Sequence, residues 1–296
     1  MVQFLTPAVT PLDEQGKFDE AGAAALYDFL IEKGTGGILA LGSMGEFFAF
    51  SMEEKKRIIR FAAQAIGHRV PFLVGPGGTA LKEVLELGRF AVDAGADGLV
   101  VVPPYYFALG GDDVFAWFDA LAGELPIPIY IYNFPDRTGY DIPVETVAAL
   151  ARRHKNMAGI KDTVHAFDHT RELIKAIKPF RPDFKVYSGY DDNLTRNAFS
   201  GGDGCIAGLG NAAVDVAHDW VEAVNSGDLE GIRTCQRKMD RVMSLYAIGP
   251  QFVPLMKEAL RLRGVPILSK VTAPLPEVTP EQSEKLRALL EQEDML

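Results

Sequence analysis

The stretch Met157-Ala158-Gly159-Ile160-Lys161-Asp162-Thr163 decides both the fold and the chemistry expected of this chain. An apolar run of strand length ends there in a lysine, just before a polar loop, so the lysine is expected at the mouth of a buried strand. Burial beside apolar walls lowers the pKa of a lysine and frees the neutral amine, which attacks a ketone carbon to form an imine. The stretch therefore predicts Schiff-base chemistry at Lys161, although an isolated lysine is more often simply solvated.

Composition narrows the class of protein. The 296 residues are 48% hydrophobic and 24% charged, which is typical of a globular protein with a substantial core. We expect a cytoplasmic protein, because no apolar run is long enough for a membrane helix and residues 1–7 lack the features of a signal peptide. A net charge of −10 without a basic cluster argues against nucleic-acid or membrane partners. Cys205 and Cys235 have no C-x-x-C spacing, so neither a disulfide framework nor a cysteine metal site is expected.

Strand-length apolar runs alternate with amphipathic helical segments along the chain. The expected strands are 4–9, 37–41, 71–75, 98–102, 127–132, 157–161, 184–188 and 204–207. The helices expected after them are 18–33, 51–66, 81–94, 113–125, 144–154, 167–178, 193–199 and 213–225. Eight such units in about 220 residues predict a closed α/β (β/α)₈ TIM barrel. An open sheet fits less well, because no G-x-G-x-x-G follows the first strand.

Further helices are expected at 229–246, 251–264 and 280–292, more than a barrel needs. No flexible linker or charge run separates them from the preceding residues. We therefore expect a catalytic barrel over residues 1–225 and a C-terminal helical extension over 226–296, packed on the barrel.

Barrel enzymes place their chemistry at the carboxyl ends of the strands. Tyr132 and Lys161 end adjacent strands, so their backbones should lie roughly 5 Å apart, close enough to share one small substrate. A phenol there could shuttle the protons that imine formation and carbon–carbon cleavage require. The other segments expected at these ends are Gly42-Ser43-Met44-Gly45-Glu46, Pro104-Tyr105-Tyr106, Asn133-Phe134-Pro135, Gly189-Tyr190-Asp191-Asp192 and Ile206-Ala207-Gly208.

Three of these motifs resemble a known family. Gly42-Ser43-x-Gly45-Glu46, Tyr132-Asn133-x-Pro135 and Gly159-Ile160-Lys161-Asp162 are similar, in order and spacing, to those of the pyruvate-dependent class I aldolases. This family includes dihydrodipicolinate synthase, N-acetylneuraminate lyase and 2-keto-3-deoxygluconate aldolase, and the resemblance covers essentially the whole chain.

The resemblance implies a role for each motif. Lys161 would be the Schiff-base lysine, Tyr132 the proton-transfer residue and Ser43 a relay hydroxyl. Tyr106 would complete the relay of a neighbouring subunit, in a homotetramer built as a dimer of dimers. The partners would be small keto acids and aldehydes, and no cofactor would be needed.

The glycines, the glutamate and the histidines near these motifs allow separate predictions. Gly42 and Gly45 would let the backbone approach a ligand and bind its carboxylate with amides, although turn glycines before a capped helix are commoner. Glu46 is expected to be a structural hydrogen-bond acceptor under this loop, since a carboxylate beside the substrate's own carboxylate would repel it. His165 and His169 have the spacing of a metal pair, but no H-E-x-x-H is present, and we expect no metal.

The residues that bear on the identity of the substrate favour different reactions. Met44 occupies the position at which dihydrodipicolinate synthases have a second residue with a hydroxyl group. A thioether cannot donate a hydrogen bond to a carboxylate. Asp191, in a motif similar to that of sugar-acid lyases, would accept hydrogen bonds from substrate hydroxyls. Arg137 favours a synthase instead, because these enzymes hold the aldehyde's carboxylate with an arginine there. Gly189, Tyr190 and Ile206 complete the expected substrate contacts.

We therefore expect a lyase that cleaves or forms 2-keto-3-deoxy sugar acids, with pyruvate as the three-carbon partner. One alternative is dihydrodipicolinate synthase, which condenses pyruvate with aspartate semialdehyde. Another is a keto-deoxy sugar acid dehydratase, because the motif Gly45-Glu46-Phe47-Phe48 resembles that of such dehydratases. A barrel that senses a keto acid without catalysis is a further alternative.

The first prediction concerns the imine. Incubation with pyruvate and borohydride should fix a three-carbon adduct on Lys161, because hydride reduces an imine irreversibly. Intact mass and peptide mapping would measure it. An unchanged mass, or an adduct on another lysine, would contradict the mechanism and favour the sensor.

Overall fold

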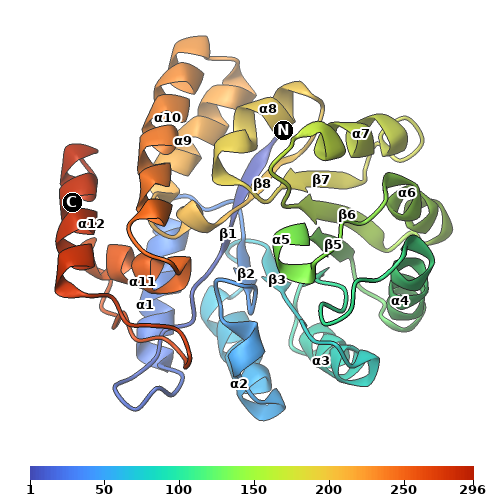
Figure 1. Ribbon diagram of the computed structural model, residues 1–296, viewed down its shortest axis with the longest axis horizontal. Coiled ribbons are helices and arrows are strands. Elements are labelled where there is room, and N and C mark those ends of the chain that lie inside the picture. The colour runs from blue at the N-terminus through green and yellow to red at the C-terminus, as the bar shows by residue number, and fades with distance from the viewer.

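Eight parallel strands pair in sequence order and close into a barrel, as the computed structural model of residues 1–296 shows (Figure 1). The ring closes where β1 pairs with β8 as well as with β2. Nearly every strand residue is buried, which explains the continuous apolar runs. The predicted (β/α)₈ barrel is confirmed. Its strands are β1 (Gln3–Pro7), β2 (Ile38–Ala40), β3 (Phe72–Val74), β4 (Gly98–Val101), β5 (Ile129–Asn133), β6 (Met157–Asp162), β7 (Lys185–Ser188) and β8 (Gly204–Ile206).

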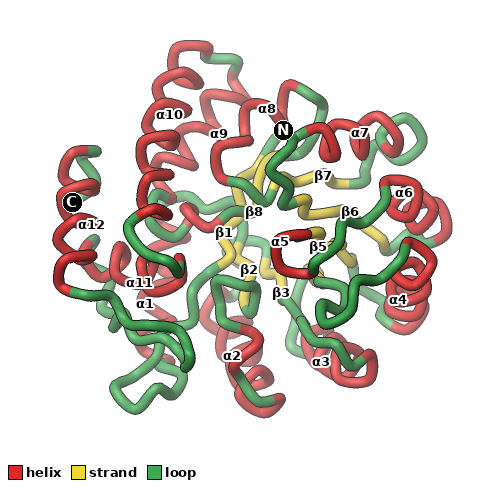
Figure 2. Tube along the Cα trace, in the orientation of Figure 1, coloured by secondary structure: helices red, strands yellow, loops and turns green.

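Helices surround the strands and form the outer layer, which Figure 2 shows in red around the yellow barrel. They begin and end close to the expected residues. In α2, for example, Ser51 and Glu54 form the predicted capping box, and Gly67 ends the helix in the left-handed conformation. These helices are α1 (Glu20–Glu32), α2 (Met52–Ile66), α3 (Leu81–Asp93), α4 (Gly111–Glu124), α6 (Val144–Arg153), α7 (Asp168–Ile177), α8 (Leu194–Phe199) and α9 (Val214–Ser226).

Three more helices lie on one side of the barrel: α10 (Leu229–Val242), α11 (Phe252–Leu262) and α12 (Pro280–Gln292) (Figure 1). The helix expected over 229–246 ends as an α-helix at Val242 and continues as the 3₁₀ helix η4 (Met243–Ala247). Arg263 attaches this part of the chain to the barrel through the Ala212 carbonyl and the Asp215 carboxylate. The boundary at residue 225 stays a prediction. No helix is both long and apolar enough to cross a membrane.

Short helical turns follow several strands and were not predicted. The one after β5 is α5 (Pro135–Thr138), which starts with a proline and ends at Gly139 in the left-handed conformation. The others are η1 (Phe47–Ala49), η2 (Asp191–Asn193) and η3 (Gly208–Gly210). A single turn is too short to give a helical period, so the sequence pattern could not reveal them.

A buried ion pair connects the loop after β2 to α11. Glu46 and Lys257 are both fully buried, with Lys257 Nζ 2.5 Å from Glu46 Oε1. The second carboxylate oxygen accepts hydrogen bonds of 2.7 Å from the Thr272 amide and hydroxyl. Glu46 has a φ of 55°, which is unfavourable for a side chain with a Cβ, so these partners hold a strained turn in place. The structural role predicted for Glu46 is confirmed.

Removing one member of this pair should destabilise the fold strongly. Lys257→Met leaves the Glu46 carboxylate buried without its counter-ion, and we expect a loss of about 3–5 kcal/mol in the free energy of unfolding. Denaturant titration would measure it. The matched control is Lys285→Met on α12, which breaks a solvated pair with Glu281 and should have a far smaller effect. Equal losses in the two variants would contradict the importance of the buried pair.

Candidate active site

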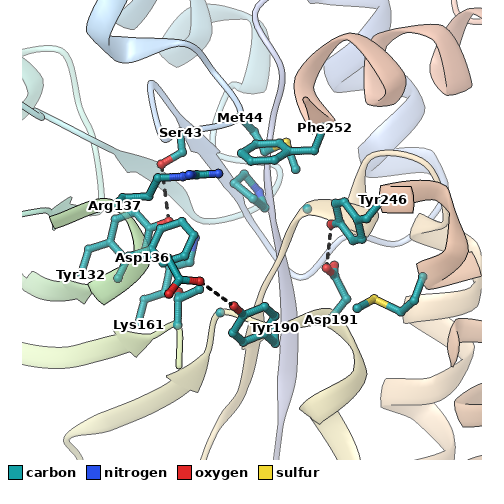
Figure 3. A pocket seen from close by; sticks show the side chains of 16 residues that line it. Ser43, Met44, Tyr132, Asp136, Arg137, Lys161, Tyr190, Asp191, Tyr246 and Phe252 are labelled. Carbon is teal, nitrogen blue, oxygen red and sulfur yellow. Dashed lines mark hydrogen bonds between the residues drawn. The ribbon is translucent and has the colours of Figure 1, made fainter. Parts of the chain in front are cut away.

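A pocket lies at the carboxyl ends of the strands and contains both Lys161 and Tyr132 (Figure 3). Residues of the loops after the strands form most of its wall, and residues from η4 and α11 complete it. The lining residues are Pro7, Ser43, Met44, Tyr132, Phe134, Asp136, Arg137, Lys161, Thr163, Gly189, Tyr190, Asp191, Gly208, Met243, Tyr246 and Phe252. The pocket is where barrel enzymes place their chemistry.

The pairing of β5 with β6 brings Tyr132 and Lys161 together. They are direct partners in the register, and Lys161 Nζ lies 4.2 Å from the centre of the Tyr132 ring. Both residues are buried, with exposures of 6% and 5%. A bulge near Ile129 and Tyr130 advances β6 by one residue, which gives this pairing. The amine therefore stands against the face of the phenol, largely away from water.

Gly159 makes this close pairing possible. It lies two residues before Lys161 on the same strand, opposite Tyr130. A side chain at this position would collide with the Tyr130 ring and with the Lys185 carbonyl oxygen. The glycine of the motif is therefore a packing requirement of the barrel wall beneath the amine.

The loop after β2 faces the Tyr132 hydroxyl. Ser43 Oγ lies 3.4 Å from it, and Figure 3 draws this contact. The backbone amides of Ser43 and Met44 donate no hydrogen bond within the chain, although both residues line the pocket. On the other side, Phe134 stacks on Tyr132 with an interplanar angle of 25°. The Tyr132 side chain thus contacts an aromatic ring and a hydroxyl, and two free amide donors belong to the loop that carries this hydroxyl.

A buried network behind the pocket holds the ends of β5 and β6. Asp162 is fully buried and accepts hydrogen bonds from Asn133 Nδ2 at 2.7 Å and Thr170 Oγ1 at 2.6 Å. His169 Nδ1 lies 3.0 Å from both oxygens of Asp162. Burial lowers the pKa of His169, but its hydrogen bond with Asp162 and the charges of Asp162 and Asp141 outweigh burial and raise it to about 9. His169 therefore carries a charge that compensates Asp162.

Asp191 is 3% exposed, and both its oxygens already have partners. Oδ1 accepts a hydrogen bond from the Leu209 amide at 2.6 Å, and Oδ2 accepts one from the Tyr246 hydroxyl at 2.7 Å (Figure 3). Burial raises the pKa of Asp191 to about 6, although these hydrogen bonds oppose the rise. The Asp191 carboxylate connects the β7 loop to η4, and only its remaining lone pairs are free for a ligand.

Comparison with known proteins gives the family of this chain. The profile of the Dihydrodipicolinate synthetase family matches residues 1–293. The chain belongs to this family. Its relatives include the putative 2-dehydro-3-deoxy-D-gluconate aldolase YagE of Escherichia coli K12, 37% identical over 97% of this chain and 95% of that protein. The probable 2-dehydro-3-deoxy-D-pentonate aldolase YjhH of the same organism is 32% identical over 99% and 97%.

Synthases also appear among the relatives in the Dihydrodipicolinate synthetase family. The 4-hydroxy-tetrahydrodipicolinate synthase of Hydrogenobaculum sp. is 33% identical over 99% of this chain and 98% of that protein. Among solved structures, YagE of E. coli K12 in complex with pyruvate superposes with a TM-score of 0.97 at 36% identity, covering 100% of this chain and 99% of that one. Family membership and fold are thus shared by proteins with different named reactions.

The structure brings most of the predicted site residues of this family member into one pocket. These are Ser43, Met44, Tyr132, Arg137, Lys161, Gly189, Tyr190 and Asp191. Gly42, Gly45 and Ile206 lie outside the lining, although the two glycines belong to the loop that carries Ser43 and Met44. Tyr106 also lies outside, with an exposure of 83% and its ring against Phe107. The catalytic and binding roles of all these residues stay predictions.

His165 and His169 do not form a metal pair. His169 contacts Asp162 and the Ile142 carbonyl, whereas His165 lies beside Asp136, 2.8 Å away. No group of three histidine, cysteine or acidic side chains is arranged to hold a metal ion.

Several pocket residues were not predicted. Thr163 follows Lys161 by two residues, and the alternation of a strand could have indicated that both face the same side. Its hydroxyl is buried without any hydrogen-bond partner, and a side chain at Gly189 would collide with it. The sequence has no comparable signal for Met243, Tyr246 and Phe252, because only the packing of the last helices brings them to the strand ends.

Loss of the Tyr132 hydroxyl should impair turnover without unfolding the protein. Tyr132→Phe keeps the ring beside Lys161 and the stack on Phe134, so we expect turnover to fall about 10²-fold or more, as for a positioned acid/base. The control is Tyr140→Phe, whose hydroxyl bonds the Pro104 carbonyl outside the pocket. Steady-state kinetics and thermal unfolding would be compared. Turnover within a few-fold of the parent would assign the protons to Ser43 or water.

Proposed function

We propose that this protein is an imine-forming lyase that cleaves or forms 2-keto-3-deoxy sugar acids, with pyruvate as one product. The observation that carries the proposal is the Lys161 amine, 4.2 Å from the Tyr132 ring, with Ser43 beside the phenol. The named activities of YagE and YjhH support a sugar-acid substrate. Imine chemistry needs no cofactor, because the lysine amine itself forms the covalent bond to the substrate.

The cleavage follows from these groups. The Lys161 amine adds to the C2 ketone, and loss of water gives an iminium ion. The Tyr132 hydroxyl protonates the departing water and is left as a phenolate, which then takes the proton of the C4 hydroxyl. The C3–C4 bond breaks, and the electron pair of this bond moves into the iminium to form an enamine. The aldehyde leaves with the new carbonyl at C4. Protonation of the enamine at C3 and addition of water at C2 then release pyruvate and restore the amine.

Two groups of free polar atoms suit the ends of such a substrate. The unpaired amides of Ser43 and Met44 offer donors for the C1 carboxylate, as an anion nest does. The unpaired Thr163 hydroxyl, two residues after Lys161 and in the same pocket, offers a partner for a substrate hydroxyl. A buried hydroxyl without a partner is costly, so a ligand that bonds it would be favoured.

The synthase reaction is the second candidate, and Arg137 is the observation that favours it. The Arg137 guanidinium lies over the rings of Phe134 and Phe252, at 5.5 and 5.8 Å, and forms no ion pair or hydrogen bond. A free guanidinium in the pocket could pair with the carboxylate of aspartate semialdehyde. A dehydratase would share the imine but eliminate water.

The assembly is also a proposal. Tyr106 and Phe107 are 83% and 73% exposed, which is unusual for adjacent aromatic side chains. Their exposure supports a homotetramer in which Tyr106 reaches the site of a neighbouring subunit. In such an assembly Tyr106 would complete a relay that ends at Ser43 and Tyr132.

Substrate comparison tests the proposal. We expect pyruvate release from 2-keto-3-deoxy sugar acids with a higher kcat/KM than condensation of pyruvate with aspartate semialdehyde. Thr163→Val should lower kcat/KM for the sugar acid about 5- to 10-fold, the value of one neutral hydrogen bond, while Thr163→Ser keeps the hydroxyl and much of the rate. Pyruvate release and condensation would be followed in the same preparations.

Two results would reverse the assignment. Efficient condensation with aspartate semialdehyde and no cleavage of any sugar acid would favour the synthase, and Arg137→Ala should then weaken that aldehyde while leaving the pyruvate imine intact. Release of water without pyruvate would favour the dehydratase.

A further inference from the structure

Three loops meet at a polar cluster on one side of the pocket, formed by Asp136, His165 and Tyr190. Asp136 lies on α5, His165 between β6 and α7, and Tyr190 after β7. Asp136 Oδ2 is 2.8 Å from His165 Nε2 and 3.4 Å from the Tyr190 hydroxyl, and these two groups are 3.1 Å apart. Figure 3 shows the Asp136 carboxylate and the Tyr190 hydroxyl pointing toward one another. The two rings also pack together, with centroids 5.0 Å apart.

The cluster holds one oxygen of the Asp136 carboxylate and leaves the other free. Oδ2 takes both contacts, whereas Oδ1 has no hydrogen bond within the chain. Burial and the charge of Asp136 raise the pKa of Tyr190 to about 12, so its phenol stays protonated and can donate to the carboxylate. Asp136 and Tyr190 both line the pocket that contains Lys161. A fixed acceptor is therefore presented to whatever occupies this part of the pocket.

The next residue offers the complementary group. Arg137 lines the same pocket and has no ion pair, not even with Asp136, since neighbours on a helical turn point in different directions. Its position over Phe134 and Phe252 restrains it. A free carboxylate oxygen and a free guanidinium on the wall of one pocket suit a substrate with two adjacent hydroxyls, because one hydroxyl can donate to the carboxylate while the other accepts from the guanidinium.

Asp136 and Arg137 together also discriminate between aldehydes. A terminal carboxylate on the aldehyde would gain from Arg137 but would lie near the like charge of Asp136, which offsets the gain. An aldehyde without hydroxyls would leave both groups unbonded as it displaces their water. Only an aldehyde with hydroxyl groups forms hydrogen bonds with both side chains.

We propose that Asp136 determines specificity, its free oxygen binding, together with Arg137, a vicinal diol at the aldehyde end of the substrate. His165 and Tyr190 are the positioning residues that hold the carboxylate. This inference rests on the proposed imine-forming function and names the substrate class that the site selects, hydroxylated rather than carboxylated aldehydes.

Condensation of pyruvate with three aldehydes tests this selectivity: D-glyceraldehyde with a vicinal diol, propanal without hydroxyls, and succinic semialdehyde with a carboxylate. In Asp136→Ala, the ratio of kcat/KM for D-glyceraldehyde over propanal should fall about 10- to 100-fold, mostly through KM, as for a lost hydrogen bond to a charged group. In both Asp136→Ala and Asp136→Asn, the ratio for succinic semialdehyde over propanal should rise, because the like charge is gone. His165→Ala should give a smaller shift in the same directions.

A matched control removes a carboxylate of the same region outside the pocket. Asp168 begins α7 with a side chain that is 75% exposed and paired with Arg171. Asp168→Asn should leave both ratios at the parent's values. If it shifts them as Asp136→Asn does, the effect is one of overall charge and the inference is overturned.

The remaining outcomes separate this inference from the proposed function. Borohydride trapping of the pyruvate imine is measured in the parent and in every variant. If the adduct forms in all of them but Asp136→Ala leaves the ratios unchanged, or lowers all three aldehydes equally, the specificity role is overturned and the lyase stands. If the parent forms no adduct, the proposed function is overturned, and this inference with it.

Discussion

The register between β5 and β6 is the constraint on which the site depends. A slip of one residue would turn Lys161 or Tyr132 away from its partner, because successive side chains of a strand point to opposite faces. The bulge near Tyr130 sets this register, and Gly159 leaves the space that it needs. The Asn133, Asp162 and His169 network then ties the two strand ends together. Every other pocket residue is arranged around a pair whose position the barrel wall has already determined.

The last helices are part of this site and not an appendage to it. The fully buried pair of Glu46 and Lys257 anchors the loop that carries Ser43, and thus sets the distance of that hydroxyl from Tyr132. Tyr246 reaches the opposite wall and bonds Asp191. The barrel supplies the amine and the phenol, while the helices after it hold two of the loops that surround them. Folding of this extension and assembly of the pocket are therefore coupled.

Charge at the pocket is distributed in two different ways. Asp162 and Asp191 are buried, and hydrogen bonds with His169 and Tyr246, respectively, compensate the cost of burying their charges. These two carboxylates therefore hold the residues around the pocket in place. Asp136 and Arg137 lie on one exposed turn, and each keeps part of its bonding capacity unused. The first arrangement favours rigidity, and the second leaves groups available to a ligand. Relatives in this family carry the names of both aldolases and synthases.

The sequence by itself determined the barrel, the places of its eight strands and main helices, and the positions of Lys161 and Tyr132 at the ends of adjacent strands. Those features depend on local periodicity and on the order of the strands, which one chain displays directly. Nothing local indicates α5, the partners of Asp191, or the reach of Tyr246 and Phe252 into the pocket. These depend on contacts between segments far apart in the chain, such as that of Glu46 with Lys257, whose positions differ by 211. Such contacts exist only once the helices have packed, so only the tertiary structure decided them.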